Sequence, residues 1–250
     1  MVPTKLFITS FSNGVWPSVM PSLNDFHLGL KTKFGLKREL CCKSSTRYVY
    51  MQDFSSPSYW NALYSEDSTE QSTEWHLAGE AFISHLEGVL GPPDEHKALL
   101  NVGCGTSAIW SSMYDRGWRN ITNIDFSQVC VERGRQVSTD KPGVQWAVMD
   151  ACDLKFPDSV FDAAIDKGTL DAIVCSEGFD WLVPRMTRSL TRVLRPGGAW
   201  VCVSFTRPDL VLPLIESVHW RVDVERLDSL WMYVGKMKDV GYDCDDLDSA

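Results

Sequence analysis

From about residue 98 onward, short apolar runs alternate with stretches in which apolar side chains recur every three or four positions. The first runs predict strands at "ALLNVG" (98–103), "ITNID" (121–125) and "VQWAVMD" (144–150). Between them, helices are predicted at "SAIWSSMYDRG" (107–117) and "SQVCVERGRQV" (127–137). This alternation predicts an α/β fold with a largely parallel sheet.

The second half of the pattern adds more strands. "SVFDAAID" (159–166) is the fourth predicted strand. A helix follows in which Leu182, Met186, Leu190 and Leu194 recur every four residues, and "RPGG" (195–198) is expected to end it. "AWVCVSFT" (199–206) is a fifth strand, and 219–227 with 229–237 should form an antiparallel hairpin, because almost no loop separates them.

Composition and charge limit the functions that the chain could have. The chain has 250 residues, 44% hydrophobic and 23% charged, which is typical of a globular protein. The first fifty residues hold seven bases and two acids, so the total net charge of −9 leaves about −14 on the rest. An acidic body argues against a nucleic-acid partner and suits a cationic ligand or a basic protein site. No apolar run is long enough to span a membrane.

The basic, serine-rich residues 1–50 have the composition of an organelle transit peptide, with the mitochondrion (matrix) favoured. The alternative is a disordered basic tail on a cytoplasmic protein. At the other end, the acidic residues 239–250 are expected to fray. The folded chain is expected to be a monomer.

The eight cysteines form no CxxC pair and share no metal-ligand spacing with the five histidines. They are expected to be reduced and mostly buried thiols. The sequence therefore predicts no metal site.

In open α/β sheets, ligands bind beyond the carboxyl ends of the strands. The segments in these positions are "GCGTS", "DFS", "MDA" and "DKG". Gly103 and Gly105 permit a tight turn and a close approach of the backbone to a ligand. Asp125 lies about twenty residues on, where a ribose-binding acid belongs, so an NAD-dependent dehydrogenase competes at this point.

Two later positions discriminate between the cofactors. Asp150 stands where its carboxylate could accept from the exocyclic amine of an adenine. A dehydrogenase has no use for the "DKGTLDAI" segment (166–173), and the chain lacks a His or Tyr/Lys arrangement suited to hydride transfer. A nucleotide other than NAD is therefore favoured.

The segments "LLNVGCGTSAI", "NIDFS", "VMDACDLKFPDSVFDAAIDKGTLDAI" and "LTRVLRPGGAWV" resemble the motifs of class I S-adenosylmethionine-dependent methyltransferases. The "GCGTS" and "DKGTLDA" forms resemble one subgroup, which contains the elongation factor 1-alpha lysine methyltransferases and the mitochondrial citrate synthase lysine methyltransferase. The resemblance implies a Rossmann-like seven-strand sheet over 98–238, mostly parallel with a C-terminal antiparallel hairpin. It also implies S-adenosylmethionine as cofactor.

The subgroup also accounts for "PSYWNALYSEDSTEQSTEWH" (57–76), which resembles an element that folds over the cofactor. On that basis residues 51–97 form a helical cover, and Trp60, Tyr64 and Trp75 line the cofactor pocket. Aromatic faces attract a sulfonium cation as they attract ammonium ions. The alternative is that these side chains form only the packed face of a helix. His76 replaces the aromatic residue usual at its position.

The resemblance assigns the turns after the strands to the cofactor. The glycines would pass beneath the methionine moiety, the residues after the second strand would hold ribose and flank adenine, and those after the third would recognise the adenine edge. In chain order, the implied contacts are Gly103, Gly105, Asp125, Phe126, Asp150, Ala151 and Lys167. Lys167 is expected to use its backbone, because an ammonium beside a sulfonium is unfavourable.

The two acids of the 166–173 segment are the candidate catalytic residues. Asp166 is expected to organise the pocket beside the transferred methyl group, with Gly168 allowing the backbone to turn. Asp171 is expected to face the entrance and attract a cationic target; the alternative for Asp171 is helix capping. The arriving ammonium must also lose a proton, either to water or to a nearby group.

The resemblance favours a protein substrate that presents a lysine. The segment "RPDLVLPLIESVHWRVDVERL" (207–227) and the leader favour a citrate synthase-like target over elongation factor 1-alpha. A small-molecule methyltransferase, a non-catalytic cofactor-binding subunit and the dehydrogenase remain as alternatives.

Overall fold

The computed structural model describes residues 54–66, 74, 76–77, 79–216 and 220–237. The chain divides into two units, Met1–Met51 and Gln52–Ala250, and every described residue belongs to the second. The predicted leader (1–50), Trp75 and the acidic tail (239–250) lie outside the described residues. Their predicted roles stay predictions.

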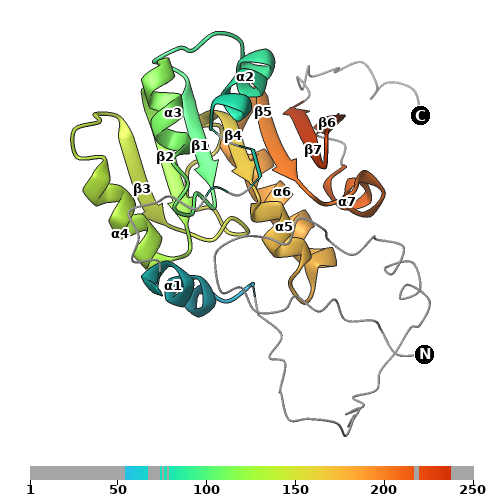
Figure 1. Cartoon of the computed structure of the whole chain (residues 1–250). Coiled ribbons are helices and arrows are strands. Elements are labelled where there is room, and N and C mark those ends of the chain that lie inside the picture. Colours follow the sequence, from blue (N-terminus) through green and yellow to red (C-terminus); the bar gives the residue numbers. More distant parts are fainter. Residues whose placement is uncertain (1–53, 67–73, 75, 78, 217–219, 238–250) are drawn as a thin grey trace, which may run out of the picture. The chain divides into compact units, whose positions relative to one another are not determined.

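One seven-stranded sheet forms the centre of the second unit, with strand order β3-β2-β1-β4-β5-β7-β6 (Figure 1). The first five strands pair in parallel, and β7 pairs antiparallel with both β5 and β6. The strands are β1 Ala98–Val102, β2 Asn120–Asp125, β3 Val144–Val148, β4 Phe161–Lys167, β5 Leu194–Ser204, β6 Trp220–Leu227 and β7 Leu230–Met237. The predicted fold class, including the C-terminal antiparallel hairpin, is confirmed.

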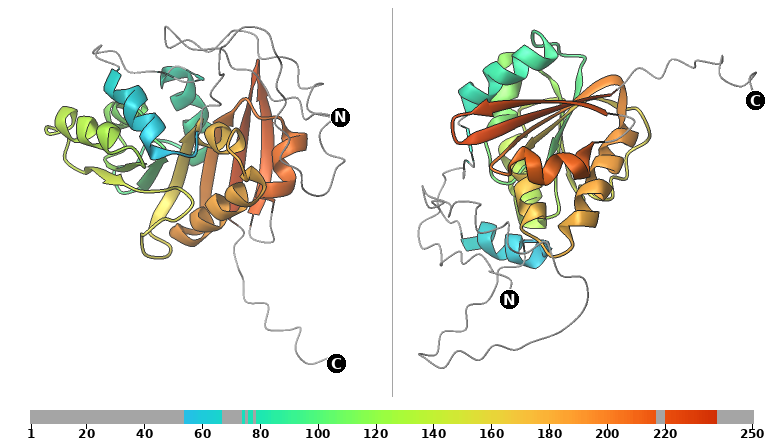
Figure 2. Two further views of the ribbon diagram at one scale, coloured as in Figure 1. Left: turned by 90° about the horizontal axis from the view of Figure 1, so that it is seen from below. Right: turned by 90° about the vertical axis from the view of Figure 1, so that its right-hand side faces the viewer.

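Helices cover both faces of this sheet (Figure 2). They are α1 Pro57–Glu66, α2 Gly79–Leu90, α3 Ile109–Arg116, α4 Gln128–Val137, α5 Thr169–Val174, α6 Phe179–Val193 and α7 Pro208–Ile215. One core contains buried side chains of α2, α3 and α4, and the other contains those of α5, α6 and α7.

The central strands read as continuous apolar runs because both of their faces are buried. Leu99 and Leu100 are each fully buried but belong to different cores, since successive side chains of a strand point to opposite faces. Burying one such side chain contributes roughly 1.5–3 kcal/mol. The strand pattern therefore fixes where each helix can pack.

Three features differ from the predicted elements. Residues 195–198 were predicted to lie between α6 and the next strand, but β5 already begins at Leu194. Leu194 pairs with Phe161, and the pairing resumes where Ala199 pairs with Ala163. The four residues form an irregularity within β5. The short helices α5 and α7 were not predicted, since α5 has only six residues and α7 contains the prolines Pro208 and Pro213.

Among the described residues, no helix combines the length and the apolar character needed to cross a membrane.

Candidate active site

The strand order reverses between β1 and β4, which are adjacent in the sheet although two strands separate them in the sequence. Ligands of open α/β sheets bind beyond the carboxyl ends of the strands at such a point. Here the turn after β1 and the turn after β4 touch: the Thr169 hydroxyl donates to the Val102 carbonyl at 2.9 Å. The glycine loop and the 166–173 segment thus form one site.

The glycine loop depends on backbone conformations that favour glycine. Gly103 and Gly105 have φ of +56° and +52°. A Cβ at Gly103 would lie 2.0 Å from the Thr169 hydroxyl oxygen, and one at Gly105 would lie 2.9 Å from the Tyr64 hydroxyl. Gly103 is therefore required for packing of the two turns against each other, before any ligand is considered.

Asp125 ends β2 and fixes the glycine loop from the side. Its carboxylate accepts from the Gly105 amide at 2.9 Å and from the Ser127 amide at 2.8 Å. Burial raises the pKa of Asp125 to about 6, although the two amide hydrogen bonds oppose the shift. An ionised carboxylate offers about four acceptor positions, so two remain for the hydroxyls of a ribose.

Helix α1 packs beside this loop. Asn61 accepts from the Ser127 hydroxyl at 2.7 Å, which ties α1 to the start of α4. Tyr64 is 5% exposed, and its ring centroid lies 5.8 Å from that of Trp60. Tyr64 therefore lies where α1 meets the glycine loop, with Trp60 beside it, and the pairing of the two rings also fits the alternative of a packed helix face.

The predicted adenine contacts are spread over two turns. Phe126 is half-buried after β2. Asp150 is exposed after β3, and its carboxylate accepts from the Cys152 amide at 2.8 Å, which shapes its own turn. Ala151 is buried in the core beside α6. Of these three, Phe126 and Asp150 present side chains that a ligand could reach.

Glu74 crosses from the preceding segment to both turns. Its carboxylate accepts from the Lys167 ammonium at 2.8 Å and from the Ala108 amide at 2.7 Å. The Ser107 hydroxyl donates to it as well. The Lys167 side chain is only 3% exposed, so its charge is neutralised within the fold. An ammonium held by Glu74 is compatible with the prediction that Lys167 contacts the cofactor through its backbone.

Asp171 does not face the entrance, contrary to expectation. It is 7% exposed and accepts from the Ser204 hydroxyl at 2.6 Å, the Thr206 hydroxyl at 2.9 Å and the Phe205 amide at 3.1 Å. His76 Nε2 lies 2.7 Å from its other oxygen. A carboxylate enclosed by these donors cannot attract a target directly. Asp171 also caps no helix. Its position beside Nε2 instead fixes the orientation of the His76 ring.

Asp166 is fully buried at the end of β4. One carboxylate oxygen accepts from the Thr169 and Leu170 amides, at 2.8 and 3.3 Å, and so holds the start of α5. The other oxygen meets no nitrogen or oxygen donor among the described residues, and the Cys202 thiol interacts with this carboxyl group. Burial, with the charge of Asp171, raises the pKa of Asp166 to about 7. Its observed role is to shape the turn.

Residues 100–202 match the family model of a methyltransferase domain. The chain carries a class I methyltransferase domain.

Curated relatives are about 30% identical to this chain over the part that can be aligned. The eEF1A lysine and N-terminal methyltransferase of Homo sapiens is 31% identical over 163 residues, which cover 64% of this chain and 23% of that protein. The EEF1A lysine methyltransferase 4 of Mus musculus is 30% identical over 158 residues, covering 60% of this chain and 61% of that protein. The chain thus spans about a quarter of the longer relatives.

Solved structures share the fold at low identity. The 1,6-didemethyltoxoflavin-N1-methyltransferase of Burkholderia thailandensis, solved with S-adenosylhomocysteine, gives a TM-score of 0.57 at 17% identity, covering 73% of this chain and 87% of that chain. A structure described as converting a disulfide bond into a thioacetal group in echinomycin biosynthesis gives 0.62 at 17% identity, covering 77% and 97%. At this identity the likeness concerns the fold.

The sequence did not identify Glu74, His76, Ser204 or Thr206 as residues of this site. Glu74 and His76 lie in "EWH", and a histidine where an aromatic residue is usual was the available signal. Ser204 ends β5 and Thr206 follows it, and nothing in their spacing indicates that Asp171 lies between them and His76.

The thiols near the site are buried, as expected for Cys104 and Cys130. Ligand atoms of Cys104, Asp125 and Cys130 lie within 4.8 Å of one another, close enough to surround an ion. A zinc ligand must be a thiolate, whereas burial raises the pKa of the Cys104 thiol well above its usual range. Both Asp125 oxygens are also engaged by amides. The arrangement therefore favours a neutral Cys104 thiol.

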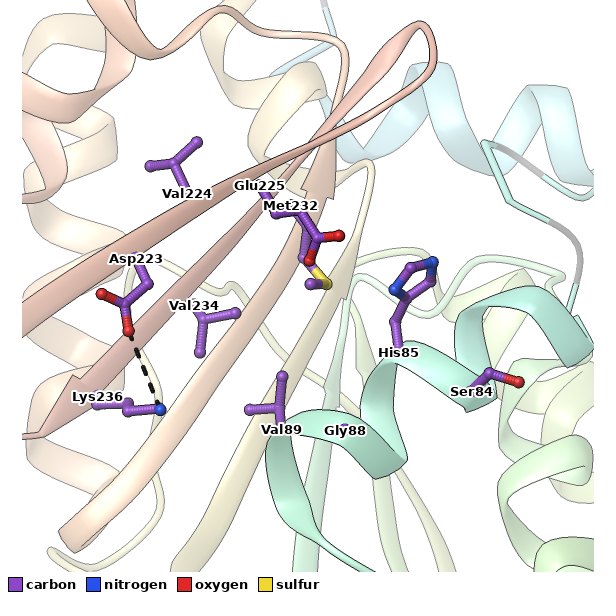
Figure 3. A pocket seen from close by; sticks show the side chains of 10 residues that line it. All are labelled: Ser84, His85, Gly88, Val89, Asp223, Val224, Glu225, Met232, Val234 and Lys236. Carbon is purple, nitrogen blue, oxygen red and sulfur yellow. Dashed lines mark ion pairs between the residues drawn. The ribbon is translucent and has the colours of Figure 1, made fainter.

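A separate pocket of about 320 Å³ lies between α2 and the β6–β7 hairpin (Figure 3). Its lining residues are Ser84, His85, Gly88, Val89, Asp223, Val224, Glu225, Met232, Val234 and Lys236. None of them belongs to the turns after β1, β2 or β4. This pocket is distinct from the site described above.

Proposed function

We propose that this chain is an S-adenosylmethionine-dependent methyltransferase that methylates an amino group of a protein, with lysine as the acceptor. The methyltransferase domain and the curated lysine methyltransferases that resemble it support the reaction class. The observation that carries the proposal is the glycine loop held by Asp125 at the point where the strand order reverses.

The residues present fit this cofactor. Asp125 keeps acceptor positions for the ribose, and the glycine loop leaves its backbone open to a close approach. Phe126 is half-buried beside Asp125, where an adenine would lie. Because Glu74 neutralises Lys167, a sulfonium at this site would not meet an uncompensated ammonium. S-adenosylmethionine supplies a methyl group activated by its positively charged sulfur.

The chain's own residues would act mainly by positioning the acceptor nitrogen relative to the methyl group. Methyl transfer to an amine is an in-line displacement, so holding the nitrogen about 3 Å from the carbon supplies much of the acceleration. Asp166 holds the start of α5 and Asp171 ties that helix to the end of β5. The two acids thus make the turn after β4 rigid next to the reacting atoms.

The target is proposed in two versions. The names of the curated relatives favour elongation factor 1-alpha. The basic leader (1–50) and the segment 207–227 favour a citrate synthase-like protein in the mitochondrial matrix, where the leader would direct the chain. The acidic charge of the remaining chain suits a basic site on either protein.

Labelling would separate the versions. The full chain is incubated with methyl-labelled S-adenosylmethionine and, separately, purified elongation factor 1-alpha, purified citrate synthase, and cytosolic and mitochondrial extracts. Label on a lysine of one protein supports the proposal and selects the target. Label on the N-terminal amine of a protein would show that this amine, and not a lysine, is the acceptor. Label found only in small molecules would contradict a protein substrate. Cofactor binding without label in any sample would indicate a non-catalytic subunit.

A further inference from the structure

One buried polar atom of the site has no partner. The His76 side chain is only 2% exposed, and its Nδ1 makes no hydrogen bond to any described residue. Leaving such an atom unsatisfied costs about 1–3 kcal/mol. The hydrogen bond to Asp171 accounts for Nε2, which a phenylalanine could not replace, but it gives no reason for a second buried nitrogen at Nδ1. Unsatisfied buried groups of this kind point to a ligand or to chemistry.

The neighbouring carboxylate determines which nitrogen carries the proton. Asp171 accepts two hydroxyl and two amide hydrogen bonds at one oxygen, from Ser204, Phe205 and Thr206. Its other oxygen lies 2.7 Å from His76 Nε2, so we assign the ring hydrogen to Nε2, which donates a hydrogen bond to the carboxylate. In the neutral ring, Nδ1 is then a lone-pair acceptor.

The ring is held firmly at the turn after β4. A Cβ at Gly168 would lie 3.3 Å from Nδ1, so only glycine leaves this nitrogen room beside the backbone. The ring centroid lies 4.6 Å from that of Phe205. The backbone of His76 has φ of +71°, a conformation that costs about 1–3 kcal/mol outside glycine and clusters at functional sites.

Building on the proposed function, we propose that His76 is the proton acceptor for the target ammonium, and that Asp171 is its positioning residue. The lysine arrives protonated and cannot attack until it loses a proton. Its N–H bond breaks, Nδ1 takes the proton, and the free amine keeps the electron pair that forms the new N–C bond. The imidazolium is stabilised by Asp171 and later releases the proton to water.

The charges around the ring suit this role. Asp171, which lies in α5, contacts Nε2 of His76. Lys167 precedes Gly168 on β4, and its ammonium is paired with Glu74. Asp166, also on β4, interacts electrostatically with Asp171, and its own pKa is raised to about 7. A positive ring would therefore have the Asp171 carboxylate in contact and no unpaired cation among these groups.

His76→Gln tests the role because its amide can still donate to Asp171 but offers no basic nitrogen. With a protein acceptor identified by labelling, we expect the turnover number at pH 7.5 to fall about 10²–10⁴-fold, with unchanged affinity for S-adenosylhomocysteine. The loss should shrink at pH 10, where lysine deprotonates without help. Asp171→Asn should give a smaller loss. The matched control is His96→Gln, at a side chain 88% exposed, which should retain full activity.

The outcomes are separable from those of the proposed function. If the wild-type chain labels no protein, the proposed function fails. If it does, a His76→Gln rate within threefold of wild type, or a loss that is the same at pH 7.5 and 10, overturns the assignment of His76. Nitrogen NMR of the full chain needs no acceptor: we expect the proton on Nε2 of His76, and a proton on Nδ1 would overturn the proposal in either case.

Discussion

The turn after β1 and the turn after β4 lie side by side at the reversal of the sheet, yet they are stabilised in different ways. The glycine loop relies on backbone conformation and on Asp125, at the end of the next strand along the chain. The turn after β4 carries three charged residues, and two of them, Lys167 and Asp171, are paired with residues more than ninety positions earlier. The first turn is therefore held mainly by its backbone conformation and one acid, whereas the charges of the second turn depend on partners far away in the sequence.

This difference shows that a sequence can reveal where a site lies without revealing which residues pair with its charged side chains. A loop that depends on glycine conformation can be identified from the glycines themselves. A charge buried at the end of a strand indicates only that some partner exists, because burying it alone would cost too much. In this chain the partners are Glu74 and His76, which lie before the sheet begins.

The largest effect is expected from Gly103→Ala, which would break the contact between the two turns. The new Cβ would meet Thr169 at 2.0 Å, and φ of +56° disfavours any side chain. We expect a loss of about 3 kcal/mol in the free energy of unfolding, measured with denaturant. Gly88→Ala in α2 is the control, since a Cβ there meets nothing within 4 Å and should cost nothing. Equal effects of the two changes would contradict this packing.

Glu74→Gln should have the next largest effect, because it leaves the Lys167 ammonium buried without a charge partner. We expect a loss of about 2 kcal/mol, reduced from the cost at a fully buried pair because Glu74 is 30% exposed. Glu80→Gln, which breaks the exposed pair with Arg116, is the control and should cost under about 1 kcal/mol. The account of the second turn is wrong if Glu74→Gln is as mild as the control.

The smallest loss of stability is expected from Asp166→Asn. The pKa of Asp166 is raised from 3.8 to about 7, so the folded chain binds its proton more tightly than the unfolded chain. Its ionisation therefore lowers stability as pH rises from about 4 to about 7. Asparagine is neutral and keeps the acceptor for Thr169 and Leu170, so the change should be within about 1 kcal/mol near pH 4. At pH 7 the variant should be more stable than the wild type, because the decline is flattened.

Denaturant unfolding between pH 4 and pH 8 would measure the decline. Asp125, with a pKa raised to about 6, contributes a similar slope that should remain in the Asp166→Asn variant. An unchanged profile would show that Asp166 does not titrate in this range.

The strand pattern predicted the sheet because buried parallel strands are apolar throughout, as at Leu99 and Leu100. Short helices such as α5 were missed, since six residues show no helical repeat. Among site residues, Gly103, Gly105 and Asp125 were placed by strand ends and glycines, which are local features. The enclosure of Asp171 could not be predicted, because its donors come from His76, Ser204 and Thr206, which the fold alone brings together.

Cofactor affinity of the full chain tests the central claim most directly. Isothermal titration with S-adenosylhomocysteine should show one site per chain, and Asp125→Asn should weaken binding at least about tenfold by removing a charged acceptor. Asp153→Asn, at an exposed acid after β3, should bind like the wild type. NADH should not compete. No binding of S-adenosylhomocysteine, displacement by NADH, or an Asp125→Asn variant with unchanged affinity would contradict the account.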